Sequence, residues 1–98
     1  MVVDDDANVL AYISTVVEKA GFEVESFASS ELAIQMISKL APTVIITDMR
    51  MPIADGFAVL EAAKSVDPDL PVVILTGMSD IQIAVEAMKR GAADYVCK

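Results

Sequence analysis

The segment TVIITD at residues 43–48, followed by MRMPIADG at residues 49–56, decides the fold of this chain. Its first six residues form a short apolar run rich in β-branched side chains, which predicts a buried strand. Asp48 comes where this run stops and a loop containing Pro52 and Gly56 begins. In an open α/β sheet, ligands bind beyond the carboxyl ends of the strands, so Asp48 is a candidate site residue. A loop aspartate that caps the next helix is the alternative interpretation.

The composition indicates one compact domain with a modest core. The 98 residues are 55% apolar but only 5% aromatic, so small and branched aliphatic side chains must fill the interior. A chain of this length buries roughly 60–70% of its unfolded surface. No apolar run approaches the ~20 residues that a membrane span requires, and no signal peptide is visible. We therefore expect no membrane partner.

The charge balance and the rare residue types exclude several functions. Seven basic against fifteen acidic residues give a net charge of −8, which is the wrong sign for binding phosphate backbones. Any nucleic-acid role must therefore belong to another module. Histidine is missing, which excludes His-based catalysis and zinc ligation, and the single Cys97 forms no internal disulfide. Both features suit the reducing cytoplasm.

Strands and helices alternate along the whole sequence. Strands are expected at residues 1–3, 22–27, 43–48, 72–76 and 93–97. Helical spacing predicts four helices with inward residues Leu10, Ile13, Val17 and Ala20; Ala33, Met36, Ile37 and Leu40; Phe57, Leu60 and Ala63; and Ile81, Ala84, Val85 and Met88. Strict alternation with buried strands predicts a parallel sheet with right-handed crossovers and helices on both faces.

Residues that favour helix ends bound these helices. The expected N-caps are Asp5 or Asp6, Ser29 or Ser30, and Ser79 or Asp80. Gly21 and Gly91 stand where a glycine ends a helix, and Pro42 ends the second one.

Parallel strands bring their carboxyl ends to one edge of the sheet, where polar residues distant in sequence should meet. Asp4 and Asp5 follow the first strand, Asp48 and Thr76 end the third and fourth, and Lys98 follows the fifth. Carboxylates about 5 Å apart repel by roughly 3 kcal/mol per pair at an effective dielectric near 20. A structural role does not explain that cost, whereas a hard divalent cation such as Mg²⁺, which prefers oxygen ligands, does.

These groups suit phosphoryl transfer. A carboxylate nucleophile beside a metal ion, the hydroxyl of Thr76 and the ammonium of Lys98 would cradle the oxygens of a transferred group. Taken singly, the aspartates could be a capping run, Thr76 a strand-end hydroxyl and Lys98 a solvated side chain. Their joint placement at one edge of the sheet favours the functional interpretation.

The same positions carry a set of motifs: Val3-Asp4-Asp5, Thr47-Asp48, Met51-Pro52, Asp55-Gly56, Leu75-Thr76-Gly77, Gly91-Ala92-Ala93-Asp94-Tyr95 and Lys98. With them the chain resembles, over essentially its whole length, the receiver domains of two-component response regulators. Arg50 and residues 76–81 look most similar to receivers of enhancer-binding, σ54-activating regulators. The resemblance implies a flavodoxin-like, doubly wound, five-stranded sheet in the order 2-1-3-4-5.

The resemblance also implies the phosphoacceptor and its metal site. Asp48 would accept a phosphoryl group from the phosphohistidine of a sensor histidine kinase or phosphotransfer protein. Mg²⁺, with Mn²⁺ as an alternative ion, would be held by Asp5, Asp48 and the backbone carbonyl of Arg50. Asp4 would act on the metal through water.

Further roles are implied for the residues around the phosphoryl group. Thr76 would bond one of its oxygens and Lys98 would pair with it. Tyr95 matches the aromatic residue that reorients as Thr76 moves, which switches the surface of the fourth helix and fifth strand. Arg50 and Met78 border the path of attacking water, so they would tune the phosphoryl lifetime.

Residues 1–98 are thus expected to be one receiver domain, truncated at both ends and without its output domain. The first strand is short, and the family continues beyond Lys98 with a proline and a fifth helix. We expect this missing helix, or self-association as a homodimer, to cover one apolar face. The domain would be a regulatory phosphoacceptor that promotes its own phosphorylation and dephosphorylation rather than an enzyme.

Three alternatives use similar residues. An aspartyl phosphatase of the haloacid dehalogenase kind needs an acid where Arg50 stands. In a flavodoxin-like flavin carrier, the run of aspartates after the first strand would repel the flavin phosphate. A degenerate receiver would act only as a docking module, and phosphorylation of Asp48 separates it from an active one.

Overall fold

The computed structural model describes residues 1–77 and 80–98, which form a five-stranded parallel sheet and four helices. The strands are β1 (Val2–Val3), β2 (Ser26–Phe27), β3 (Ile45–Asp48), β4 (Val72–Thr76) and β5 (Asp94–Cys97), and the helices are α1 (Ala7–Lys19), α2 (Ser30–Leu40), α3 (Gly56–Val66) and α4 (Ile81–Lys89). The strand order is β2-β1-β3-β4-β5, with every pairing parallel. The flavodoxin-like, doubly wound topology expected from the sequence is confirmed.

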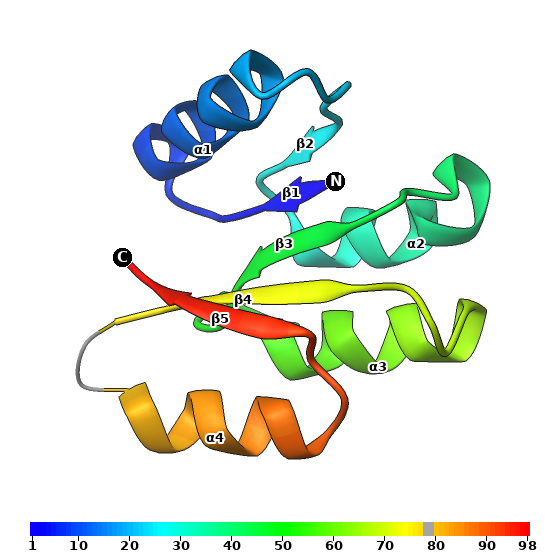
Figure 1. Cartoon of the computed structure of the whole chain (residues 1–98), viewed down its shortest axis with the longest axis vertical. Coiled ribbons are helices and arrows are strands. Elements are labelled where there is room, and N and C mark those ends of the chain that lie inside the picture. Colours follow the sequence, from blue (N-terminus) through cyan, green and yellow to red (C-terminus); the bar gives the residue numbers. More distant parts are fainter. Residues whose placement is uncertain (78–79) are drawn as a thin grey trace.

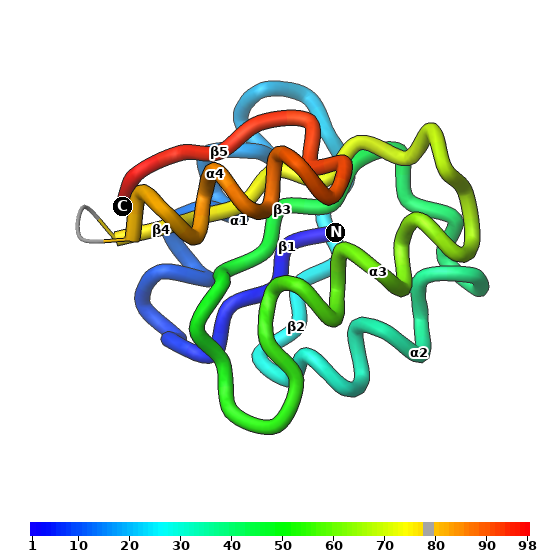
Figure 2. Tube along the Cα trace, turned by 90° about the horizontal axis from the view of Figure 1, so that it is seen from below, coloured from blue at the N-terminus to red at the C-terminus, as the bar shows by residue number. Residues whose placement is uncertain are grey.

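The sheet lies between two layers of helices (Figure 1). Helix α1 covers one face, and α2, α3 and α4 cover the other. The chain trace turned by 90° shows α2 and α3 running beside each other, and their residues are in contact (Figure 2). Because all strands are parallel, the residues that follow them gather at one edge of the sheet.

The core lies between the sheet and the layer of α2, α3 and α4. Strand residues such as Ile45, Val72 and Ile74 are fully buried there against Ile37 of α2 and Leu60 of α3. Side chains alternate across a strand, so the intervening residues face α1 instead. This packing holds β1, β3 and β4 rigidly and thereby fixes where their carboxyl ends lie.

Helix ends follow the expected residues except at α4. The side chain of Asp6 accepts hydrogen bonds from the amides of Asn8 and Val9, which caps α1. Ser29 caps α2 in the same way. Asp80 occupies the N-cap position of α4, but its side chain makes no capping hydrogen bond among the described residues. Ser79, the other expected cap, lies outside the described residues.

The expected inward faces are partly wrong. Helix α4 packs through Ala84 and Ala87, whereas Ile81, Val85 and Met88 are 46%, 46% and 39% exposed. Ala84 was among the expected inward residues and is buried, as is Ala87, which also fits helical spacing. Small side chains let the helix approach the sheet closely, so spacing alone does not select the buried side. Ala20 is exposed as well, because it is the C-cap that follows α1.

The strand expected at residues 22–27 is shorter than predicted. Only Ser26 and Phe27 pair, with Val2 and Val3 of β1. Strand β2 is an edge strand beside the two-residue strand β1. The Glu25 carbonyl still accepts a hydrogen bond from the Val2 N–H at 2.9 Å, but β1 is too short to pair with the residues before Glu25. Similarly, β3 begins at Ile45 rather than residue 43, and β5 at Asp94 rather than residue 93.

Candidate functional site

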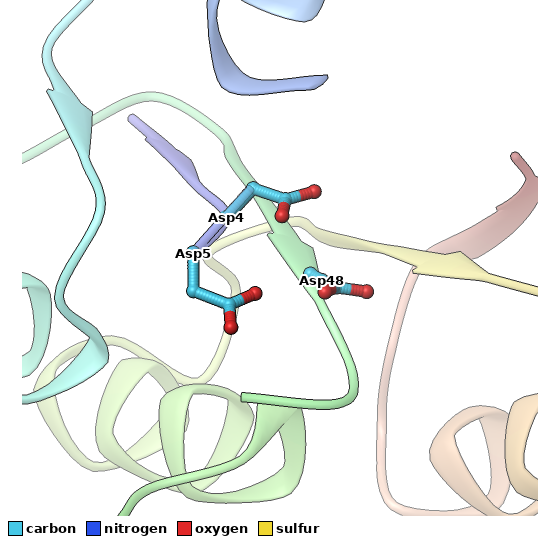
Figure 3. A group of neighbouring side chains, drawn as sticks. All are labelled: Asp4, Asp5 and Asp48. Atoms are coloured by element: carbon cyan, nitrogen blue, oxygen red, sulfur yellow. The ribbon is translucent and has the colours of Figure 1, made fainter. Parts of the chain in front are cut away.

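Three carboxylates form a cluster at the carboxyl edge of the sheet (Figure 3). One oxygen each of Asp4, Asp5 and Asp48 lies within 4.8 Å of the other two. Asp4 and Asp5 follow β1 and Asp48 ends β3, and the pairing of these neighbouring strands brings the three together. Asp4 is fully buried and Asp48 nearly so, whereas Asp5 is exposed. The cluster therefore opens to solvent on the side of Asp5.

Lys98 completes the cluster from the end of β5. Its Nζ lies 2.9 Å from Oδ1 of Asp48 and 3.2 Å from Oδ2 of Asp4. The backbone N–H of Lys98 donates to the carbonyl of Thr76 at 2.7 Å, which continues the β4–β5 ladder. Burial lowers the pKa of Lys98, but the two carboxylates outweigh it and raise the pKa overall. The ammonium is therefore fully charged at neutral pH.

Asp4 is the most deeply buried acid of the cluster. Burial raises the pKa of Asp4, the hydrogen bond that the Asp6 amide donates to Oδ1 opposes the shift, and the charge of Asp48 adds to it. Oδ2 has no hydrogen-bond partner among the described residues, and it forms an ion pair with Lys98 Nζ at 3.2 Å. The Lys98 ammonium offsets part of the cost of burying this carboxylate. The oxygen still lacks a hydrogen-bond donor among the described residues, so it could also serve as a ligand of a cation.

The loop after β3 holds Asp48 in place. Oδ1 of Asp48 accepts a hydrogen bond from the amide of Met49 at 2.9 Å, and the hydroxyl of Thr47 donates to the Asp48 carbonyl at 2.9 Å. The loop then returns, and Gly56 N–H donates to the carbonyl of Met49. A Cβ at Gly56 would lie 2.8 Å from the Asp48 carbonyl oxygen. Only glycine fits this return, and α3 begins there under the Asp55 cap.

Thr76 and Tyr95 lie on the neighbouring strands β4 and β5. Thr76 is 1% exposed, and its Oγ1 has no hydrogen-bond partner among the described residues. In the β4–β5 register Tyr95 is opposite Ile74 and Thr76 is opposite Cys97. Tyr95 is half-buried and packs against the core on the α4 side. The unpartnered hydroxyl of Thr76 is thus a second polar group at this edge that a ligand would satisfy.

Arg50 forms an ion pair that sequence reasoning missed. Its Nε donates to Oδ2 of Asp80 at 2.8 Å, and its Nη2 contacts Oδ1. The hydrogen bond with Arg50 lowers the pKa of Asp80, and the same bond raises that of Arg50. Sequence reasoning assigned Asp80 only as a helix cap, since no local signal connects residues 30 positions apart. Met78, assigned with Arg50 to tuning, lies outside the described residues.

One cavity of about 550 Å³ lies between Asp5 and Asp48 of the cluster, Lys98 and the Arg50–Asp80 pair. Its lining residues are Asp5, Asp6, Asp48, Arg50, Gly77, Asp80 and Lys98. It is therefore the space in which a ligand would meet the carboxylates, the ammonium and the guanidinium together.

The family model for the response regulator receiver domain matches residues 1–98. This chain belongs to that family. The receiver sequence is 40% identical over 96 residues to the C4-dicarboxylate transport transcriptional regulatory protein DctD of Rhizobium meliloti, covering 98% of this chain and 21% of DctD. It is 35% identical over 98 residues to the regulatory protein AtoC of Escherichia coli, covering all of this chain and 21% of AtoC. The chain thus spans about a fifth of the length of these relatives.

Solved receiver structures agree with the fold. The receiver domain of NtrX from Brucella abortus superimposes with a TM-score of 0.93 at 31% identity, over 99% of this chain and 82% of that one. A receiver domain protein from Clostridium thermocellum gives a TM-score of 0.92 at 36% identity, over 99% and 79%. Receiver domains are regulatory phosphoacceptors of two-component signalling. None of the described helices is long and apolar enough to cross a membrane.

The acidic cluster of this receiver has the donor set of a hard-cation site. Three carboxylates supply the oxygen ligands that Mg²⁺ prefers, and Oδ2 of Asp4 is buried without a hydrogen-bond partner in the described part of the chain. The ammonium of Lys98 offsets part of the negative charge of these carboxylates through its contacts with Asp4 and Asp48. The residues present therefore fit the cation that receiver domains generally bind.

Proposed function

We propose that Asp48 accepts a phosphoryl group from a sensor histidine kinase or phosphotransfer protein and thereby controls an output module. The observation that carries this proposal is the ion pair of Asp48 with Lys98 at 2.9 Å inside a cluster of three carboxylates. A nucleophile, a fixed cation and a hard-metal donor set in one cavity are the parts that phosphoryl transfer requires.

The transfer exchanges one bond to phosphorus for another. A carboxylate oxygen of Asp48 forms the P–O bond while the P–N bond of the donor phosphohistidine breaks. The bonding pair stays on the imidazole nitrogen, which then takes a proton. Lys98 stabilises the charge of the transferred group. Asp5, Asp48 and the carbonyl of Arg50 would hold Mg²⁺, or Mn²⁺ in its place, with Asp4 acting through water; the bound ion neutralises phosphoryl oxygens.

The response to phosphorylation begins at Thr76. Its buried hydroxyl, unpartnered among the described residues, donates to a phosphoryl oxygen, and the space that it leaves admits the ring of Tyr95. This movement reshapes the surface of α4 and β5. Both conformers coexist before phosphorylation, and the phosphoryl group biases their populations. Arg50 and Met78 tune how long the phosphoryl group persists.

The output of this receiver is transcription regulation in the cytoplasm. DctD, AtoC and NtrC among its relatives are named as regulators, and they support the enhancer-binding, σ54-activating subtype that the sequence resembles. Residues 1–98 act as the receiver of a longer regulator, in which nucleic acid is reached through the output domain. Receiver homodimers are the assembly that this role favours.

Intact mass after exposure to a small acyl phosphate tests the proposed function. We expect a phosphoryl adduct in the wild type with Mg²⁺ and none in Asp48→Asn, because the variant lacks the nucleophile. Asp69→Asn is the matched control, since Asp69 is exposed in the turn before β4 and should leave the adduct unchanged. An equal adduct on Asp48→Asn, or on the wild type in excess chelator, contradicts the assignment.

A further inference from the structure

The Arg50–Asp80 pair links the phosphoacceptor loop to helix α4. Arg50 lies two residues after Asp48, and Asp80 immediately precedes α4. Both donor nitrogens of the guanidinium meet both oxygens of the carboxylate, which is the stronger, bidentate form of this ion pair. The side chain of Asp80 is only 9% exposed, whereas that of Arg50 is 68% exposed. The guanidinium therefore holds a nearly buried carboxylate from the solvent side.

This pair keeps Asp80 from capping α4. The N-cap side chains of the other three helices, Asp6, Ser29 and Asp55, each accept a hydrogen bond from an amide of the first turn. Asp80 stands at the equivalent position but makes no such bond within the described residues. Asp80 thus has two competing partners, the Arg50 guanidinium and the amides of α4, and in this structure Arg50 holds it.

Arg50 in turn has a potential second partner in the cavity. Arg50 and Asp80 line the same cavity as Asp5, Asp48 and Lys98. Lys98 already contacts Asp48, the residue that would carry the anion, and Arg50 is a second cation lining the cavity that can turn toward it. A phosphoryl group on Asp48 carries about −1.5 to −2 charge and three acceptor oxygens, which exceeds the single charge of Asp80.

We propose that Arg50 exchanges Asp80 for the phosphoryl group on Asp48, and that Asp80, once released, caps the N-terminus of α4. The exchange rests on the proposed function, because it needs an anion at Asp48. Through this exchange, the negative charge of an anion at Asp48 would determine whether Asp80 caps the start of α4. The exchange differs from the movement of Thr76 because it starts at the Arg50–Asp80 side-chain pair, although the backbone N–H of Asp80 donates to the carbonyl of Gly77, next to Thr76, at 3.0 Å.

Thermodynamic reciprocity predicts the direction in which each variant changes the affinity for the anion. If the anion must remove Arg50 from Asp80, then Asp80 opposes anion binding, and neutralising Asp80 should strengthen it. Asp80→Asn suits this purpose because asparagine caps helices as well as aspartate does. Arg50→Gln breaks the same ion pair but also removes the cation that the anion would gain. Asp80→Asn should therefore raise the affinity for the anion and Arg50→Gln should not, whereas a purely structural link would change the affinity of both variants alike.

Binding of the phosphoryl mimic fluoroberyllate in the presence of Mg²⁺ tests the exchange in the intact protein. We expect Asp80→Asn to bind it about fivefold more tightly than the wild type, at the low end of couplings between sites. Arg50→Gln should bind it equally or more weakly. Glu86→Gln is the matched control, since it breaks the Arg90–Glu86 pair on α4, outside the cavity, and should leave affinity unchanged.

Amide NMR spectra supply a readout independent of affinity. Without any ligand, the α4 amides of Asp80→Asn should move toward their positions in the fluoroberyllate-bound wild type. Unchanged affinity in Asp80→Asn, or tighter binding by Arg50→Gln as well, would overturn the exchange while leaving the proposed function intact. A wild type that binds no fluoroberyllate would instead remove the proposed function, and the exchange with it.

Discussion

At the scale of single residues, Asp4 is the acid of the site whose negative charge is most costly to bury. It is fully buried, lies in a cluster with two other carboxylates and has one oxygen without a hydrogen-bond partner in the described residues. Because burial raises the pKa of Asp4 in the folded state, the folded chain binds this proton more tightly than the unfolded chain does. The stabilising contribution of this group is therefore present at low pH and lost as pH rises through the folded-state pKa.

Asp4→Asn should stabilise the chain at pH 7 in excess chelator by about 1 kcal/mol. The relieved repulsion is about 3 kcal/mol per carboxylate pair at an effective dielectric near 20, and loss of the contact with Lys98 offsets part of it. The advantage should vanish as the pH falls through the pKa of Asp4, and Mg²⁺ should stabilise the wild type more than the variant. Thermal unfolding from pH 3 to pH 8, with and without Mg²⁺, measures the pH dependence of this difference and the effect of the ion. Asp69→Asn is the control. An unchanged free energy of unfolding for Asp4→Asn at pH 7 would contradict the energetic cost that we assign to the buried charge of Asp4.

The residues of the cluster could be predicted from the sequence, whereas the Arg50–Asp80 pair could not. Asp4, Asp48 and Lys98 each mark the end of a strand, and parallel strands bring their ends together whatever their distance in sequence. The Arg50–Asp80 contact depends on side-chain conformations and on where α4 begins, which no periodic pattern encodes. Asp80 gave only the signal of a helix cap, and tertiary contact with Arg50 overrides it.

At the scale of elements, the connection from β3 to α3 determines how Asp48 is presented. Gly56 packs directly against the backbone of Asp48 and Met49, and its N–H bonds the Met49 carbonyl. Ile53 in the same loop adopts a φ of 72° and is 89% exposed, a conformation that branched residues rarely adopt. The loop is therefore shaped by its return to β3 rather than by the preferences of its residues.

Gly56→Ala should destabilise the chain by about 2 kcal/mol, because the new methyl group would overpack the loop. Its Cβ would lie 2.8 Å from both the Asp48 carbonyl oxygen and Met49 Cα, so backbone must shift and the Asp48 carboxylate with it. Gly77→Ala is the control, since among the described residues the nearest atom to its Cβ would be Asp80 Oδ2 at 3.7 Å. Urea unfolding compares the free energies of unfolding of the two variants with that of the wild type. Equal stability of the two variants would show that the loop gives way easily.

The order of the elements followed from the sequence, but the buried side of α4 did not. Continuous apolar runs and capping residues placed the strands and helices, since both signals are local. On α4 several apolar residues surround the helix, so the helical period predicted Ala84 correctly but grouped it with the exposed Ile81, Val85 and Met88 rather than with Ala87. The sheet selects the alanine side because it packs closely there, and that selection belongs to tertiary structure.

At the scale of the whole molecule, the two faces of the sheet are covered unequally. The face toward α2, α3 and α4 holds the core, while α1 alone covers the other (Figure 1). On that second face Val96 of β5 is 50% exposed, and a cavity of about 430 Å³ lies between α1 and the strands β4 and β5. Tyr12, Ile13, Leu75 and Val96 are among its lining residues.

Residues 1–98 expressed alone should therefore self-associate through this face. If about 400 Å² of apolar surface stays wet, the cost at 25 cal/mol/Å² is roughly 10 kcal/mol, comparable to the stability of a small domain. Sedimentation velocity over a range of concentrations should show reversible association. Val96→Lys should weaken it, because a charge on this edge strand opposes burial. Val66→Lys is the matched control, since Val66 is also 50% exposed but ends α3 on the opposite face. A monomer at every concentration, with cooperative unfolding, would show that α1 alone covers this face sufficiently.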